Sequence, residues 1–166
     1  QQDLFVDNVA KLVKLAEFDV IHAHDWLTMR AAIAAKQVSG KPLITHIHAT
    51  EYDRSGGSYG NPHVRDIEYY GMMLSDKVIA ISQYVKDVLT REYNIPHDKI
   101  DIVHNSIDKD LFDIDHSSDN TFTVLTEFKK RGYKVVTNIG RLTLQKNLVN
   151  TMRAMEKVIK KEPKTH

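Results

Sequence analysis

The sequence predicts an α/β protein in which a parallel β-sheet is flanked by helices, and three observations lead to this class. Short apolar runs of strand length alternate with longer segments whose apolar residues keep a helical spacing. The short runs are nearly continuous in apolar residues, as is typical of strands buried on both faces of a parallel sheet. Gly and Pro residues separate several of the segments. Strands that alternate with helices in this way indicate βαβ units.

The chain opens with a helix, a strand and a second helix. Residues 3–17 carry apolar side chains at helical spacing, and "FDVIHAH" (residues 18–24) follows as the first strand. Residues 27–39 form the next predicted helix, which ends at Gly40 because Gly40 and Pro42 do not continue a helix.

The second strand leads into a glycine-rich loop. "PLITHIH" (residues 42–48) is the strand, and "SGGSYGNP" (residues 55–62) is the loop. Asn61 and Pro62 suit the N-cap and first position of the helix that follows. One face of that helix is marked by small and apolar residues, namely Val64, Ile67, Gly71 and Leu74.

Two further strands enclose one more helix. "KVIAIS" (residues 77–82) is the third strand, and Ser82 is placed to cap a helix that continues to Tyr93. Pro96 ends that helix, and "KIDIVHN" (residues 99–105) supplies the fourth strand.

The composition changes after the fourth strand. Residues 109–120 are polar and acidic, as in a linker. Residues 121–131 are ambiguous, with a short helix as one interpretation, and "YKVVTNIGR" (133–141) predicts a strand. The last helix carries an apolar stripe of Leu148, Val149, Met152, Met155, Val158 and Ile159. One strand and one helix cannot bury their own apolar faces. We therefore expect residues 1–108 to be part of one domain and residues 121–166 to be the truncated start of another.

The composition excludes several classes of function. The 23 basic and 22 acidic residues give a formal net charge of +1, which argues against nucleic acid as a partner. The chain contains no cysteine, which rules out disulfides and thiolate chemistry and fits a cytoplasmic location. No apolar run approaches the roughly 18 residues of a membrane-spanning helix.

Four histidines lie near the ends of the first two strands. His22 and His24 belong to one H-x-H pair, and His46 and His48 belong to another. Alternate residues of a strand share a face, so each pair should point in one direction. Metal binding, ordinary packing and substrate contact are the three alternatives. Zinc sites usually combine histidine with cysteine or carboxylate, so we predict substrate contact or catalysis by one histidine and no metal.

Polar residues at strand ends are candidates because ligands of parallel sheets bind at the carboxyl ends of the strands. His24, Asp25, His48, Asn105 and Arg141 occupy such positions. Glu51, which with Asp53 could form an acid/base pair, lies in the loop that follows the second strand. An exposed surface role is the alternative for these loop carboxylates.

"GRLTLQK" (residues 140–146) has the chemistry of a phosphate site. Gly140 ends the predicted strand, and Arg141 and Lys146 bracket a loop that leads to a helix N-terminus. Two cations beside a positive helix end suit a diphosphate. The spacing is not that of a Walker loop, and solvated surface cations are the alternative.

Five blocks taken in order resemble retaining glycosyltransferase family 4, in particular its glycogen-synthase-like and sucrose-phosphate-synthase-like members. The blocks are "DVIHAHDWLT", "THIHATE", "SDKVIAISQYVKDVL", "IVHNSID" and "IGRLTLQKN". The resemblance runs from about residue 19 to residue 160. It implies the GT-B fold, in which two Rossmann-like domains enclose a cleft. The first domain holds the acceptor and the second holds a nucleotide sugar, so the chain would contain part of the first and the first strand–helix unit of the second.

The resemblance also implies a role for individual residues. His48 matches the family's catalytic histidine, which lies against the donor sugar. His24 and Asp25 match the acceptor side, and Glu51 and Asn105 are grouped with them as cleft-lining residues. The donor diphosphate would be bound by Gly140, Arg141 and Lys146, with no metal or other cofactor.

The sequence departs from the family pattern at two positions, with Ser106 and Asn147 where glycine is common. The family's N-terminal glycine-rich loop and its E-x7-E segment are not present, so we expect a fragment that is inactive alone and able to self-associate. The predicted function of the parent is transfer of a sugar, with glucose preferred, from a nucleoside-diphosphate sugar to a carbohydrate or other hydroxyl acceptor. A non-catalytic carbohydrate-binding or structural module is the alternative.

Overall fold

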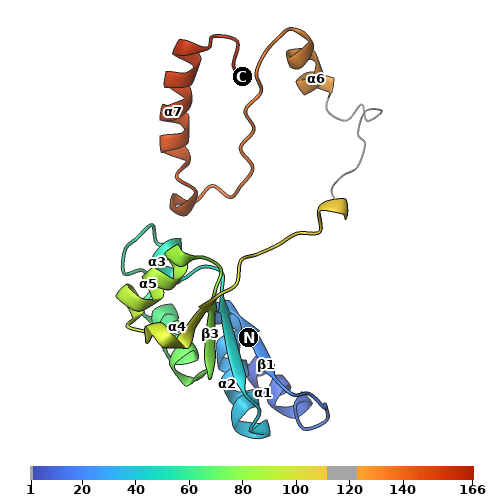
Figure 1. Cartoon of the computed structure of the whole chain (residues 1–166), viewed down its shortest axis with the longest axis vertical. Helices are drawn as coiled ribbons and strands as arrows, with labels where there is room; N and C mark the ends of the chain where they lie inside the picture. The colour runs from blue at the N-terminus through green and yellow to red at the C-terminus, as the bar shows by residue number, and fades with distance from the viewer. Residues whose placement is uncertain (1, 112–122) are drawn as a thin grey trace. The chain divides into compact units, whose positions relative to one another are not determined.

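The computed structural model describes residues 2–111 and 123–166 (Figure 1). The chain divides into two compact units, Gln1–Ser106 and Ile107–His166, and each is described here by itself. Most of the predicted linker, residues 112–120, lies outside the described residues. Within the described residues, no helix combines the length and apolar character needed to cross a bilayer.

The first unit is built on a four-stranded parallel sheet, as predicted. Its strands are β1 (Ile21–His24), β2 (Leu43–Ile47), β3 (Lys77–Ala80) and β4 (Ile100–Ile102), and they lie side by side in sequence order. In the register, Ile21 lies beside Leu43, and Thr45 lies beside Val78. All four carboxyl ends therefore meet at one edge of the sheet, where ligands of parallel sheets bind.

Among its described residues this unit has five α-helices, and four of them were predicted. They are α1 (Gln2–Leu12), α2 (Asp25–Ser39), α3 (Glu51–Arg54), α4 (Pro62–Leu74) and α5 (Gln83–Tyr93). α1 is shorter than the predicted 3–17, and α2 begins two residues earlier than expected. The predicted caps are confirmed, since the side chains of Asn61 and Ser82 accept backbone N–H groups at the starts of α4 and α5. α5 ends through Asn94, which takes a left-handed C-cap conformation before Pro96 is reached.

The apolar core lies on one face of the sheet. Ile47 and Val78 pack there against Met29 of α2, Ile67 of α4 and Val85 of α5. Residues that point to the opposite face are more accessible, and His22 and His24 are exposed while the intervening Ala23 is buried. The expectation that the first strand is buried on both faces is therefore wrong, because among the described residues the helical core covers only one of them.

α2 and α4 approach closely because a glycine lies between them. A Cβ atom placed on Gly71 would lie 2.3 Å from Sδ of the fully buried Met29, so a larger residue would force the helices apart. Val64 and Ile67 share this buried face, as predicted. Leu74, assigned to the same face, is instead half-exposed at the last position of the helix.

The second unit contains α6 (Thr123–Lys130), the short 3-10 turn η4 (Leu144–Lys146) and α7 (Leu148–Lys161). The predicted strand over residues 133–141 is wrong. Lys134 forms an isolated parallel bridge with Thr165, and the residues after it are not in a strand. A strand needs neighbouring strands that supply a full ladder, and the described part of this unit provides only that single bridge.

Candidate functional site

The carboxyl ends of β1 and β2 bring three of the predicted site residues together. His24 is the last residue of β1, Asp25 is the first of α2, and His48 directly follows β2. Nδ1 of His24 lies 2.9 Å from Nε2 of His48, so that one imidazole donates a hydrogen bond to the other. The prediction that strand ends gather these side chains is correct for this pair of strands.

Asp25 fixes the backbone that carries His48. Its Oδ1 atom accepts a hydrogen bond from the N–H of His48 at 2.8 Å and a longer one from Ala49 at 3.4 Å. Asp25 has a φ of 55°, in the left-handed region that Asp and Asn tolerate better than most residues. The hydroxyl of Thr28 donates to the carbonyl of Asp25, which holds this turn at the start of α2. The carboxylate therefore positions the turn after β2.

All four histidines of the two H-x-H pairs lie on one face and form a cluster of rings. The ring centroids of His22 and His24 are 4.4 Å apart, and those of His46 and His48 are 4.5 Å apart. Across the two strands, His22 stacks on His46 with centroids 5.4 Å apart and nearly parallel rings. One nitrogen from each of His22, His24 and His46 lies within 4.8 Å of the others, so these three could hold a metal ion.

The cluster keeps two of its imidazoles towards the neutral form. Burial lowers the pKa of His46, and the neighbouring His48, His24 and His22 lower it further, while Asp25 opposes them. The pKa of His22 is lowered by burial and by the nearby His24 and His48. Both ring nitrogens of His46 are buried and have no hydrogen-bond partner among the described residues.

The loop after His48 is closed by Glu51. Thr50 and Asp53 form a capping box that starts α3, and the Glu51 carboxylate accepts the backbone N–H of Asn61 at 3.0 Å. Gly60 has a φ of 71°, and a Cβ there would lie 2.7 Å from Cγ of Glu51. Glycine is therefore required where the loop passes over Glu51. The Glu51 carboxylate binds the protein's own backbone and is half-buried.

A buried carboxylate, Glu68 of α4, anchors this loop. It accepts the backbone N–H of Glu51 at 2.9 and 3.0 Å, the hydroxyl of Tyr93 at 2.5 Å, and a guanidinium N–H of Arg54. Burial raises the pKa of Glu68, and these hydrogen bonds partly offset that effect. Burial also raises the pKa of Tyr93, and its bond to Glu68 adds to the shift.

Neither α3 nor the Glu68 network is among the features predicted from the sequence, although the sequence carries a signal for both. Thr50 and Asp53 have the spacing of a capping box. Glu68 lies between Ile67 and Gly71 on the apolar side of its helix, where an ionisable residue needs partners. One of these partners is Tyr93, 25 positions further along the chain, and only the fold shows that it reaches Glu68.

The other predicted residues of the first unit lie apart from this network. Asn105 is exposed in the segment that follows β4. The neighbouring His104 forms a hydrogen bond through Nδ1 with the carbonyl of Ile81 at 3.0 Å, which ties this segment to the end of β3. The segment therefore belongs to the same sheet edge, with the Asn105 side chain open to solvent.

Gly140, Arg141 and Lys146 belong to the second unit. A Cβ on Gly140 would lie 3.8 Å from Cγ of Lys146, so the loop brings its two ends into contact. Arg141 and Lys146 are exposed, and the chain turns through η4 and Asn147 into α7. The prediction of a loop leading to a helix N-terminus is confirmed, whereas Gly140 does not end a strand. Asn147 makes no side-chain cap at that helix.

Comparison with known proteins assigns the chain to a protein family. The model of Glycosyltransferase Family 4 matches residues 3–111, which include all four strands and the paired histidines. The chain belongs to glycosyltransferase family 4. The resemblance predicted from the five sequence blocks is confirmed.

This family-4 chain is similar to proteins from archaea and bacteria. It is 31% identical over 148 residues to a glycosyltransferase of Methanocaldococcus jannaschii, covering 87% of this chain and 38% of that protein. It is 27% identical over 150 residues to glycogen synthase of Mycobacterium tuberculosis, covering 89% of this chain and 34% of that protein. The chain thus spans little more than a third of the length of these relatives.

Solved structures agree on the fold. Anabaena HepE in complex with UDP-glucose matches with a TM-score of 0.60 and 20% identity, over 81% of this chain and 36% of that one. A glycosyltransferase from Rickettsia africae matches with a TM-score of 0.54 and 19% identity, over 84% of this chain and 35% of that one. The expected fold class, a Rossmann-like α/β sheet of the GT-B type, is confirmed.

Proposed function

We propose that this family-4 chain supplies part of the active site of a retaining glycosyltransferase. The reaction would move a sugar from a nucleoside-diphosphate sugar to a carbohydrate or other hydroxyl acceptor. Glucose is the sugar that we propose. The supporting observation is the junction of His24, Asp25 and His48 at the carboxyl ends of β1 and β2. A hydrogen-bonded imidazole pair held by a carboxylate is suited to orient polar groups of a sugar.

His48 is the residue assigned to the donor sugar. Its backbone is fixed by Asp25, and its ring is oriented by His24, so its position depends on two hydrogen bonds. A side chain held in this way can contact a sugar with little loss of conformational freedom on binding. Support for a uridine donor comes from Anabaena HepE, which has been solved with UDP-glucose.

The acceptor side is assigned to the same sheet edge. His24 and Asp25 line it from the start of α2, Glu51 from α3, and Asn105 from the segment after β4. In the first unit the Asp25 and Glu51 carboxylates already accept backbone N–H groups. Their contribution to the acceptor would therefore be mainly to hold the backbone, while His24 orients His48 and Asn105 remains exposed for contact.

The diphosphate is assigned to the second unit. Arg141 and Lys146 are exposed cations on the loop that enters α7, and the helix start adds positive potential. As the bond to the sugar breaks, negative charge grows on the departing nucleoside diphosphate. Fixed cations placed at that charge lower the barrier, which is why we assign them the stabilising role.

The test is transfer by the full-length protein with UDP-glucose and a panel of carbohydrate acceptors. His48→Ala and Lys146→Ala should each lower kcat by roughly 10²- to 10³-fold, the range for loss of one preorganised electrostatic contact. His97→Ala and Lys161→Ala, at exposed positions elsewhere, are the matched controls. Unchanged turnover in both site variants would contradict the assignment.

The same experiment separates the enzyme from a binding module. A module would bind a carbohydrate without releasing UDP from UDP-glucose, whatever the state of His48. Residues 1–166 expressed alone are expected to show no transfer. Measurable transfer by this chain would refute that expectation.

A further inference from the structure

The face of the sheet opposite the apolar core carries a group of imidazoles that the proposed transfer reaction does not fully use. His22 and His24 come from β1 and His46 from β2, and one ring nitrogen of each lies within 4.8 Å of the others. We propose that these three histidines bind a divalent cation of the zinc class. This inference reverses the sequence-based expectation that the histidines bind no metal, and it does not depend on glycosyl transfer.

The backbone explains why the three rings meet. His22 and His24 are two residues apart on one strand and therefore share a face. Parallel pairing places His46 directly beside His24 in the register. Two ligands in an H-x-H pair and a third from the neighbouring strand thus converge without a long loop. A rigid sheet is a precise platform for such a site.

His46 provides a second, independent observation. Both of its ring nitrogens are buried, and neither has a hydrogen-bond partner among the described residues. A buried polar atom without a partner costs about 1–3 kcal/mol, so native proteins usually satisfy such atoms. The His46 ring contacts the rings of His22, His24 and His48, with centroids 5.4, 5.0 and 4.5 Å away. A cation bound among these rings would give His46 a partner.

The chemistry of the donors selects the class of ion. Neutral imidazole suits Zn²⁺, Cu²⁺ and Ni²⁺ far better than Mg²⁺ or Ca²⁺, which prefer oxygen. Three imidazoles with an open fourth position for water are a known zinc ligand set.

The distances require a small adjustment. A tetrahedral zinc ion with Zn–N bonds of about 2.0–2.1 Å places its ligand nitrogens about 3.3–3.4 Å apart. The three ligand nitrogens here lie within 4.8 Å of one another, so they must move closer together to bind the ion. Rotation of the side chains, with no change in the backbone, would have to supply this movement. His24 and His22 are exposed and have the room to rotate.

His48 would act as the outer partner of the site. Its hydrogen bond to His24 occupies one nitrogen of that ring and leaves the other to bind the ion. A bound ion would therefore tie β1 to β2 and also restrain the imidazole assigned to the donor sugar.

The experiment uses the purified chain after treatment with a chelator, followed by titration with Zn²⁺. We expect about one ion per chain by elemental analysis after buffer exchange. Co²⁺ should give the intense visible absorption of a four-coordinate site, and excess Zn²⁺ should remove it. Mg²⁺ should not compete.

Single variants identify the ligands. His22→Ala and His24→Ala change exposed positions, and each should weaken Zn²⁺ binding by more than about 100-fold, while His48→Ala should weaken it by about 10- to 100-fold, as outer partners do. His97→Ala, an exposed histidine of η1 (His97–Lys99), should leave binding unchanged. Far-UV circular dichroism of each variant verifies that the sheet has formed.

Two results would overturn the proposal. One is less than half an ion per chain, or a cobalt spectrum of octahedral type only. The other is equal Zn²⁺ affinity in the His22→Ala, His24→Ala and His97→Ala variants with native circular dichroism. Loss of transfer in the full-length protein has no bearing on either result, so failure of the proposed function and failure of the metal site are distinguishable.

Discussion

At the scale of single residues, the carboxylate of Asp25 joins the carboxyl ends of two neighbouring strands. It follows β1 in sequence and accepts the N–H groups of His48 and Ala49 beyond β2. Its own backbone is left-handed, a conformation that costs most non-glycine residues about 1 kcal/mol. The hydrogen bonds to the next strand offset this cost and hold His48 in place.

Replacing this carboxylate should destabilise the first unit. Asp25→Ala leaves the N–H groups of His48 and Ala49 without their acceptor and keeps the left-handed backbone, so the free energy of unfolding should fall by about 1–3 kcal/mol. Asp25→Asn retains an oxygen acceptor and tolerates the conformation, so its loss should be smaller. Urea unfolding followed by circular dichroism measures both. An alanine variant as stable as the wild type would contradict this role.

At the scale of elements, Glu68 connects three helices that the sheet alone does not join. It lies in α4, accepts from Glu51 and Arg54 of α3, and accepts from Tyr93 at the end of α5. α3 has only four residues and none of them is fully buried, so its packing contact with the core, through the partly buried Tyr52, is supplemented by the bonds to Glu68. The polar network therefore determines where the loop after His48 lies.

The raised pKa of Glu68 gives a test with a defined sign. Because burial raises its pKa in the folded state, the folded protein retains this proton after the unfolded chain has lost it. The contribution of Glu68 to stability is therefore complete below its unfolded pKa of about 4.3 and is lost as pH rises through its folded pKa. Glu68→Gln cannot ionise. The unfolding free energy of the wild type should therefore fall relative to that of the variant as pH rises through this window.

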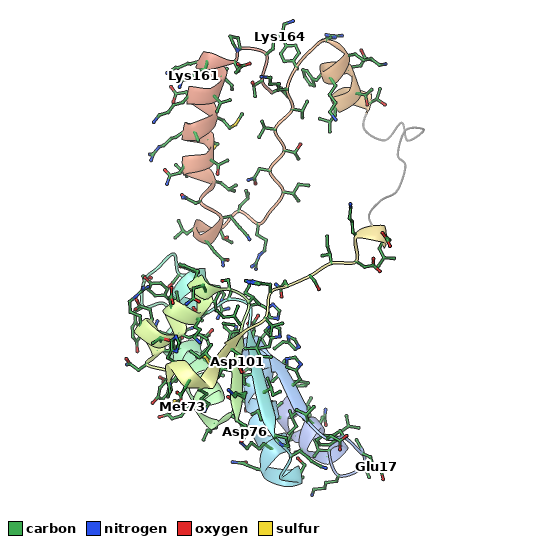
Figure 2. All side chains as sticks on the ribbon, in the orientation of Figure 1. Glu17, Met73, Asp76, Asp101, Lys161 and Lys164 are labelled. Atoms are coloured by element: carbon green, nitrogen blue, oxygen red, sulfur yellow. The ribbon has the colours of Figure 1, made fainter. Side chains whose placement is uncertain are left out.

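The control for this measurement is a glutamate outside the network. Glu17, labelled in Figure 2, is exposed, so Glu17→Gln removes a carboxylate without touching α3. Urea unfolding from pH 4 to pH 8 should separate the two variants. The quantity compared is the unfolding free energy as a function of pH. If this curve has the same shape for Glu68→Gln, Glu17→Gln and the wild type, Glu68 does not titrate as proposed.

At the scale of the whole molecule, the two units differ in how well they bury their apolar side chains. The first unit has a continuous core across α2, α4 and α5. In α7 no residue is buried, and Met152 and Val149 are 65% and 57% exposed. An exposed apolar stripe of this kind is typical of a surface that contacts another chain or aggregates.

We therefore expect residues 1–166 to self-associate through α7 as protein concentration rises. Met152→Glu places a charge in the stripe and should shift the sedimentation profile towards the monomer. Ala154→Glu, which adds the same charge outside the stripe, is the control. A monomeric wild-type chain at all concentrations, or equal shifts in the two variants, would rule this surface out.

The sequence alone was sufficient for the four strands of the first unit, the starts of α4 and α5, and the chain's family. Local signals account for this success, since a cap at Ser82 or a proline at the start of α4 acts within a few residues. The predicted strand at 133–141 failed because a strand depends on neighbours that local pattern does not reveal. For the site, alternation correctly placed each H-x-H pair on one face.

What only the tertiary structure decided concerns the partners of those residues. It showed that Asp25 binds the backbone at His48, that Glu68 receives Tyr93, and that His46 lies among other imidazoles with its nitrogens unpaired. Apart from the contact between His46 and His48, each of these contacts joins residues more than 20 positions apart, and their geometry depends on sheet register and helix packing. The sequence by itself determined the family and most elements of the first unit, because short-range patterns encode them, whereas the folded chain determined which side chains meet.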